Sequence, residues 1–248
     1  MINYLNAENY RFQRSKKFHI TNLVVLLALI AGAIGIYVIS TRVDLESLAT
    51  VFFRTTLNMM VFIIFINLIY VGILTNKDLK TLPLAIANGV SRKEIFFSKL
   101  TVLLSHIVVT EIVFMAVAVL LSRLVYGVYD PKVTKDFIVG YINLFPIIIS
   151  AFIMCYAIAI NGISEVYNSM LIFAIYGGLL KFAFYLGTAL IGPIMQYYKY
   201  TPSGVYELTL QYFDAGTMSI IPHSFVVGII ISALSIIIGY NVFKKKQF

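Results

Sequence analysis

The sequence predicts an all-α integral membrane protein that crosses the bilayer about six times. Of its 248 residues, 60% are hydrophobic and only 12% are charged, whereas a soluble domain has about 45–50% apolar and about 25% charged residues. The apolar residues gather in long runs, and a helix needs about 20 residues to cross a bilayer core about 30 Å thick. The six expected spans cover residues 20–40, 51–75, 98–122, 137–160, 168–190 and 222–243. Together they form one transmembrane domain, residues 1–248.

The apolar runs are too long and too evenly apolar to be strands. Strands of a membrane barrel have about 10 residues with alternating polarity, and no such pattern is found. The first run is long and has no small-residue cleavage site, so it is expected to remain as a span rather than act as a signal peptide. The single cysteine, Cys155, lies inside an apolar run. It excludes an internal disulfide and provides no metal-ligand spacing.

The basic residues predict the orientation of the chain. Twelve of the 19 Lys and Arg residues fall in the N-terminal segment, in the loop after the second run and in the tail. With six spans these regions share one side, and the positive-inside rule places that side in the cytoplasm. We therefore expect a multi-pass protein of the cell membrane with both termini cytoplasmic. The net charge of +8 is interpreted as a topology signal and a contact with membrane lipids, not as a nucleic-acid site.

Residues 5–19 combine basic side chains with Tyr10, Phe12 and Phe18. This mixture is typical of a short helix that lies in the membrane interface, here on the cytoplasmic side before the first span. The alternative is a disordered basic arm that only sets the topology.

The loop between the second and third runs predicts a helix, a sharp turn and a new helix start. Gly89 suits the left-handed residue that ends a helix. Ser91 and Glu94 have the spacing of a capping box, in which each residue bonds the amide of the other. A well-capped hairpin would explain this pattern, and so would a rigid docking surface for a partner. The apolar positions at near-helical spacing are Leu79, Leu82, Ile86 and Val90.

The order of these features resembles the ABC-2 family of ABC transporter permeases. Members of that family have an interfacial N-terminal helix, six spans, a coupling helix after the second span, and a small-Ser-Arg turn into the third span with a Lys following. Gly89, Ser91, Arg92 and Lys99 match that turn. Many members carry a Glu and a Gly-Thr pair before the coupling helix, and this chain departs from that pattern at residues 76–81. The exact contacts with an ATPase therefore stay open.

The resemblance implies that residues 76–92 couple the chain to two copies of a separate ABC ATPase. That partner would bind ATP and Mg; this chain has no cofactor and no GxxxxGK[ST] motif, so it is not expected to be an enzyme. A second permease copy would complete the path that the substrate takes across the membrane. A homodimer is expected, and a heterodimer is the alternative. The chain is similar to Gram-positive peptide exporters, including phenol-soluble modulin exporter permeases, and to bacteriocin-immunity permeases, which implies an amphipathic peptide or lipid-like substrate. The expected ATPase-coupling residues are Leu79, Leu82, Ile86, Gly89, Ser91 and Arg92.

Three ionisable residues fall inside the expected spans, where such groups are costly and usually face a partner or a cavity. His106 and Glu111 lie in the third run and Lys181 in the fifth. Glu111 and Lys181 are each roughly 20 Å from the start of their helix, so we expect an ion pair that either joins two spans or lines the path. His106 is expected to be a buried, hydrogen-bonded residue. Gly177 and Gly178 are expected to allow close helix approach.

Residues 191–221 form a long, aromatic external segment interrupted by prolines and glycines. The resemblance implies short re-entrant helices that cap the exit of the path; an ordinary surface loop is the alternative. The expected external gate residues are Tyr197, Tyr198, Tyr206, Tyr212 and Phe213.

Other functions remain as alternatives to an exporter. An ion-coupled carrier would use Glu111 and Lys181, although the chain has no visible internal repeat. An intramembrane enzyme is disfavoured because His106 and Glu111 are five residues apart and share a helix face poorly. A non-transporting immunity or sensory protein could have the same fold.

Overall fold

The protein is described by a computed structural model in which every regular element of the described residues is a helix. The described residues are 2–40, 48–75, 82–127 and 130–246. The all-α prediction is therefore confirmed. In chain order the helices are α1 (Ile2–Gln13), α2 (Lys16–Ser40), α3 (Leu48–Thr75), α4 (Leu82–Ala87), α5 (Arg92–Tyr126), α6 (Pro131–Ala159), α7 (Glu165–Tyr176), α8 (Leu179–Ile191), the 3-10 helix η2 (Met195–Tyr200), α9 (Pro202–Asp214) and α10 (Pro222–Lys245).

Several helices have the length and apolarity of membrane spans. Among the described residues, α2, α5, α6 and α10 pass this test singly, and α7 with α8 passes it as a pair bent by 55°. These four or five candidates indicate a membrane-embedded, multi-pass protein. The remaining expected span, residues 51–75, corresponds to α3, which has 28 residues.

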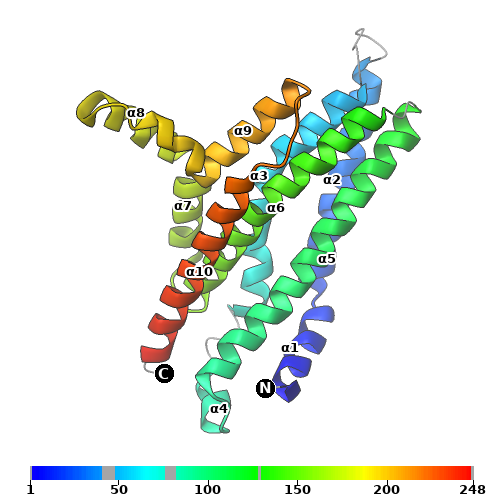
Figure 1. Ribbon diagram of the computed structural model, residues 1–248. Coiled ribbons are helices and arrows are strands. Elements are labelled where there is room, and N and C mark those ends of the chain that lie inside the picture. The colour runs from blue at the N-terminus through cyan, green and yellow to red at the C-terminus, as the bar shows by residue number, and fades with distance from the viewer. Residues whose placement is uncertain (1, 41–47, 76–81, 128–129, 247–248) are drawn as a thin grey trace.

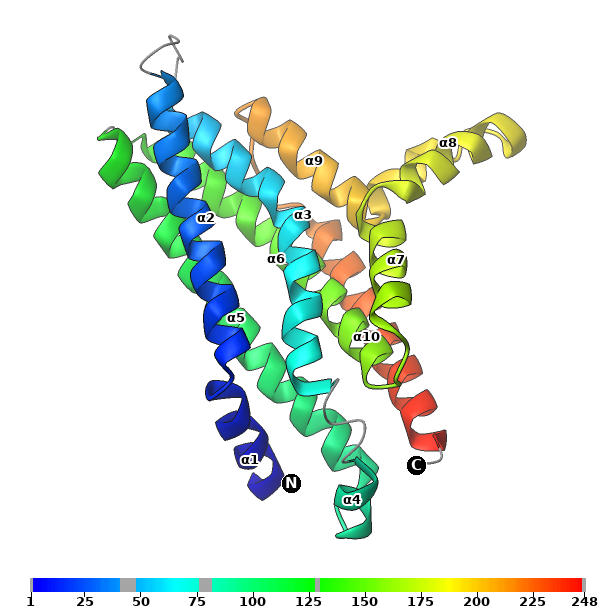
Figure 2. The ribbon, with the colours of Figure 1, turned by 180° about the vertical axis from the view of Figure 1, so that it is seen from behind.

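The long helices run side by side, with α6 at the centre between α3 and α10 (Figures 1 and 2). Both views place α1, α4 and the last turn of α10 at the same end of the bundle. The three segments expected on one side of the membrane therefore do share one end. Helix α8 projects from the bundle at the level where α7 ends (Figure 2).

Glycines allow α10 to lie directly on α6. A Cβ atom added to Gly228 would come within 2.6 Å of the Pro146 carbonyl oxygen, and one added to Gly239 within 2.6 Å of the Ala157 Cβ. Both contacts have the same sequence offset, so the two helices run parallel in one register. Such close approach at small residues is the usual way that membrane helices pack.

The helix expected over residues 5–19 is divided. Helix α1 ends at Gln13 and α2 begins at Lys16. Phe12 is buried at 1% exposure, and α1 runs along the lower part of α5 rather than across the end of the bundle (Figure 1). The break lets α1 turn this buried face toward α5, which the alternation of basic and aromatic residues did not predict.

Gly177 and Gly178 break a helix instead of packing two helices together. Gly178 has φ +93°, a left-handed conformation that is unfavourable for other residues. A Cβ atom on Gly177 would lie 2.7 Å from the carbonyl oxygen of Phe173, in its own helix. The single span expected over residues 168–190 is therefore the bent pair α7 and α8.

Candidate functional site

The turn from α4 into α5 has the conformation that its sequence predicts. Gly89 has φ +85°, and its amide donates to the Ile86 carbonyl oxygen at 3.0 Å. The Glu94 amide donates to Ser91 Oγ at 3.2 Å, and the Ser91 amide donates to Glu94 Oε2 at 3.1 Å. The left-handed glycine and the capping box are thus confirmed, and α5 begins at a fixed point.

The outward face of α4 differs from the expected coupling face. Leu82 is 1% exposed and packs in the core, and Ile86 packs partly buried against it. Leu84 is 66% exposed, although the helical spacing did not select it. The expected residue Leu79 lies outside the described residues. Leu84 is therefore the large apolar side chain that α4 leaves exposed.

Arg92 connects this turn to the end of α10. Its guanidinium donates to the carbonyl oxygen of Lys244. Lys246 Nζ in turn donates to the carbonyl oxygen of Asn161 at 2.9 Å, just beyond the end of α6. The turn, α6 and α10 are thus tied together at one end of the bundle.

Lys99 and Glu8 form a buried ion pair between α5 and α1. Lys99 Nζ lies 2.9 Å from Glu8 Oε1, with the two side chains 1% and 6% exposed. Arg11 lies 2.5 Å from the second oxygen of Glu8. Sequence reasoning singled out Lys99 but missed Glu8. A signal was available, because Glu8 and Phe12 are four residues apart and so share one face of a helix.

His106 belongs to this contact with α1. Its Nε2 lies 2.9 Å from Asn9 Oδ1, and its ring stacks on Phe12 with centroids 4.7 Å apart. The prediction of a hydrogen-bonded side chain is confirmed, although the burial is only partial. His106 fixes α1 on α5.

The expected ion pair of Glu111 with Lys181 is wrong. Tyr141 Oη lies 2.5 Å from Glu111 Oε2, and Glu111 is 1% exposed. Lys181 Nζ instead lies 2.7 Å from Glu207 Oε2 on α9. The physical reason is the bend at Gly178, which turns α8 away from the bundle and toward η2 and α9.

Polar contacts hold α9 across the end of the bundle opposite α4 (Figure 1). Arg54 on α3 contacts both carboxylate oxygens of Asp214, at 2.6 and 2.9 Å. Tyr206 donates to the Asn58 carbonyl oxygen at 2.9 Å. The first contact was missed because its partners lie far apart in sequence and neither stands in a motif.

The five expected gate residues do not share one environment. Tyr198 and Phe213 are buried, Tyr206 and Tyr212 are partly buried, and Tyr197 is 56% exposed. Tyr198 donates to Glu207 Oε1 at 3.0 Å, and burial is the main cause that raises its pKa to about 12. Most of this set therefore packs the segment onto the bundle.

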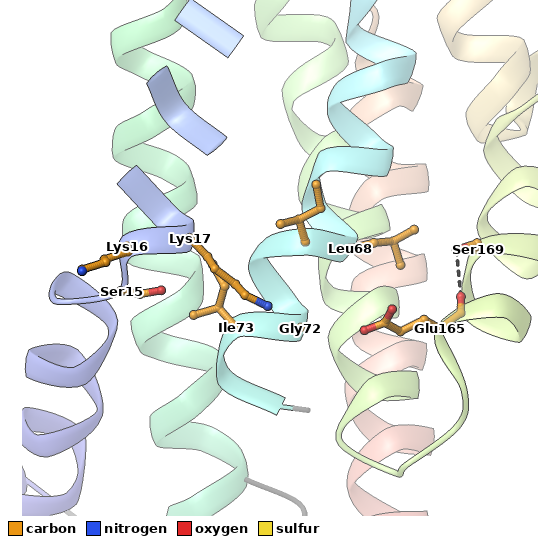
Figure 3. Close-up of a pocket in the computed structure, with 9 residues that line it drawn as sticks. Ser15, Lys16, Lys17, Leu68, Gly72, Ile73, Glu165 and Ser169 are labelled. Carbon is orange, nitrogen blue, oxygen red and sulfur yellow. Dashed lines mark hydrogen bonds between the residues drawn. The ribbon is translucent and has the colours of Figure 1, made fainter. Parts of the chain in front are cut away.

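A polar cavity of about 560 Å³ lies between the start of α2, the end of α3 and the start of α7. Figure 3 shows the Lys17 ammonium pointing into it from α2 and the Glu165 carboxylate pointing into it from α7. Lys16 also lines the cavity at the start of α2. Leu68 and Ile73 of α3 provide the apolar wall between the two charges. Sequence reasoning missed this cavity, because Lys17 appeared only as a topology signal and Glu165 only as part of a loop.

Comparisons with known proteins found no matching family model, no matching curated protein and no matching solved structure. Among the described residues, no group of three or more His, Cys, Asp and Glu residues is placed to hold a metal ion. The function is therefore argued from the arrangement of this chain's own residues.

Proposed function

We propose that this chain is the membrane permease subunit of an ABC exporter, driven by a separate ATPase chain. The observation that carries the proposal is the turn at Gly89 and Ser91, which is capped on both sides and bonded through Arg92 to the backbone of α10. If a partner moves this turn, the movement passes directly to α5, which begins there, and to α10, which Arg92 contacts. The exposed Leu84 on α4 offers the contact through which an ATPase would apply that motion.

The proposed topology has six spans with both termini in the cytoplasm. It counts α3 as a span, because its 28 residues extend over about 42 Å. It also counts α7 and α8 as one broken span. Helix α1 would then lie at the cytoplasmic surface, where Tyr10 is 57% exposed and available to lipid headgroups.

The proposed external segment is η2 with α9, as a re-entrant cap over the exit of the path. Its support is the pair of ionic contacts, Arg54 with Asp214 and Lys181 with Glu207, that hold α9 between α3 and α8. Two ATPase copies, with their ATP and Mg, and a second copy of this chain would complete the assembly. The substrate class that suits the apolar chain is an amphipathic peptide or a lipid-like compound.

The alternative function, an ion-coupled carrier, is not supported by the positions of Glu111 and Lys181. It depended on Glu111 and Lys181 acting together within the membrane. Each of these residues has a different partner, Tyr141 and Glu207 respectively.

The test is co-purification of the solubilised chain from its native membrane, with ATPase activity measured on the proteins that accompany it. Leu84→Asp and Arg92→Glu should remove the ATPase from the purified fraction. Leu124→Asp is the matched control, since Leu124 is 79% exposed but lies at the opposite end of α5. An ATPase that remains bound to Leu84→Asp, or the absence of any ATPase with the unmodified chain, would overturn the proposal.

A further inference from the structure

The polar cavity beside Lys17 has opposite charges on opposite walls. The Lys17 ammonium enters from the first turns of α2 and the Glu165 carboxylate from the first turn of α7 (Figure 3). The two walls therefore offer a cation and an anion to a ligand that carries both of the opposite charges. An ammonium is a good point-charge partner for a phosphate, and a carboxylate accepts charge-assisted hydrogen bonds from a primary amine.

A separate apolar groove lies between the same two helices, α2 and α3. The residues of this part of the chain that line the cavity are Ser15 just before α2, Lys16 and Lys17 of α2, and Leu68, Ile69, Gly72 and Ile73 of α3. The groove, of about 290 Å³, is lined by α2 from Val24 to Ile36 and by α3 from Phe52 to Ile66. The two helices are antiparallel, so higher numbers on α2 meet lower numbers on α3. The cavity and the groove together provide charged side chains at Lys17 and Glu165 and a mostly apolar lining farther along α2 and α3.

The dimensions of this site match one leaflet of a bilayer. Gly32 in the groove is 15 residues beyond Lys17, hence about 22 Å farther along the helix axis. One leaflet contributes roughly 15 Å of hydrocarbon. The groove is therefore long enough to hold an acyl chain whose headgroup lies at Lys17.

The surroundings of the groove are those of a surface in contact with lipid. Only 6% of the most apolar window of α2 is buried. Leu23 and Leu27, in the three turns that follow Lys17, are 55% and 54% exposed. On α7, which lines the cavity but not the groove, Val166 and Met170 are each 62% exposed. A membrane lipid is therefore the molecule that reaches this site most directly.

We propose that the cavity binds the headgroup of a phospholipid that carries both a phosphate and a primary amine, with one acyl chain in the groove between α2 and α3. Lys17 contacts the phosphate and Glu165 contacts the amine. The bound lipid bridges α2 and α7 at the end of the bundle that holds α4. This lipid site does not depend on the chain being an exporter, so it is tested without an ATPase or transport.

The experiment is a lipid titration of the delipidated, full-length chain in detergent, followed by native mass spectrometry. The probes are phosphatidylethanolamine, phosphatidylglycerol with the same acyl chains, and water-soluble phosphoethanolamine. The unmodified chain should bind phosphatidylethanolamine about tenfold more tightly than phosphatidylglycerol, because one charge-assisted hydrogen bond is lost with the amine. Phosphoethanolamine, which has no acyl chain, should not compete with either lipid.

Charge variants separate the two walls. Lys17→Gln should weaken the binding of both lipids about tenfold, and Lys17→Arg should retain it. Glu165→Gln should weaken the binding of phosphatidylethanolamine alone, so that the chain no longer prefers it to phosphatidylglycerol. Lys93→Gln is the matched control and should change nothing, since Lys93 is exposed on α5 and does not line the cavity.

Groove variants test the acyl chain. Gly32 faces open space and lines the groove, so Gly32→Leu fills the groove without a clash and should weaken both lipids. Gly35 also has open space beside it but does not line the groove, and Gly35→Leu is its control.

Three results would overturn the proposal. The first is equal binding of the two lipids to the unmodified chain, or Lys17→Gln and Glu165→Gln chains that bind like Lys93→Gln. The second is effective competition by phosphoethanolamine, which would make a free headgroup the ligand. The third is effective competition by a cationic amphipathic peptide when neither lipid binds, which would make the site a peptide site. Helix content measured by circular dichroism on each variant ensures that the binding data come from folded chains.

Discussion

Lys99 on α5 and Glu8 on α1 form an ion pair of 2.9 Å in which both side chains are almost fully buried. This contact attaches the N-terminal helix to α5 seven residues after α5 begins at Arg92. It sits directly above the capped turn, so α1 supports the part of the bundle that the proposed ATPase would move.

Removing the carboxylate of Glu8 should destabilise the protein strongly. Glu8→Gln removes the Glu8 carboxylate from the buried Lys99 ammonium, and breaking such a pair costs about 3–5 kcal/mol. The double variant Glu8→Gln, Lys99→Met should recover part of this loss because it also removes the buried charge. The free energy of unfolding is measured by circular dichroism during titration of mixed micelles with denaturing detergent. A double variant less stable than Glu8→Gln would contradict the role given to this pair.

Lys181 should cross-link to α9 and not to α5. In a Cys155→Ala background, cysteines introduced as Lys181→Cys and Glu207→Cys should be joined by a short thiol-reactive cross-linker, because their native side chains meet at 2.7 Å. The control pair is Lys181→Cys with Glu111→Cys. The readout is a mass shift of peptides from the digested chain. Cross-linking of the control pair alone would restore the ion pair that the sequence suggested and refute the bend.

Gly178 should resist substitution more than a glycine in a regular helix. Gly178→Ala places a Cβ atom on a residue with φ +93°, and the left-handed conformation costs other residues about 1–2 kcal/mol. Gly35→Ala, inside α2 and with open space beside it, should instead stabilise the chain by roughly 0.5–1 kcal/mol. Both values come from the same unfolding titration. Equal effects at the two positions would mean that the bend between α7 and α8 is not a fixed feature.

The sequence predicted the features that depend only on neighbouring residues. The capping box at Ser91 and the left-handed Gly89 each depend on residues within one turn, and both are confirmed. Helical character followed from the length and apolarity of the runs. The partner of Lys181 could not be found in this way, because it depends on a bend that two adjacent glycines permit but do not require.

Contacts between segments that are distant in the sequence were not predicted. Glu8 and Arg54 each find a partner that is remote in the chain and outside any motif. The cavity at Lys17 and Glu165 arises only when α2, α3 and α7 are placed together. Leu84 was missed for a different reason: helical spacing identifies the buried face of a short helix, and the residue available for docking lies on the opposite face.

The contact of α10 with α6 gives a further prediction, at Gly228. A Cβ atom there would lie 2.6 Å from the Pro146 carbonyl oxygen and 2.7 Å from the Pro146 Cβ, so Gly228→Ala must push the two helices apart. Overpacking of this kind typically costs about 1–3 kcal/mol. The backbone of Pro146 cannot move aside as a flexible side chain would, and the loss should therefore appear in full.

Gly140→Ala on α6 is a useful comparison. Its nearest neighbours are the Met218 Cε at 3.1 Å and the Leu57 Cδ1 at 3.3 Å, both at the ends of flexible side chains. These groups can give way by a few tenths of an ångström, so the stability should change much less than in Gly228→Ala. The unfolding titration compares the two variants directly. If Gly140→Ala were as damaging as Gly228→Ala, α6 would be equally crowded on both faces, and the direct backbone contact of α10 would not be what distinguishes this helix pair.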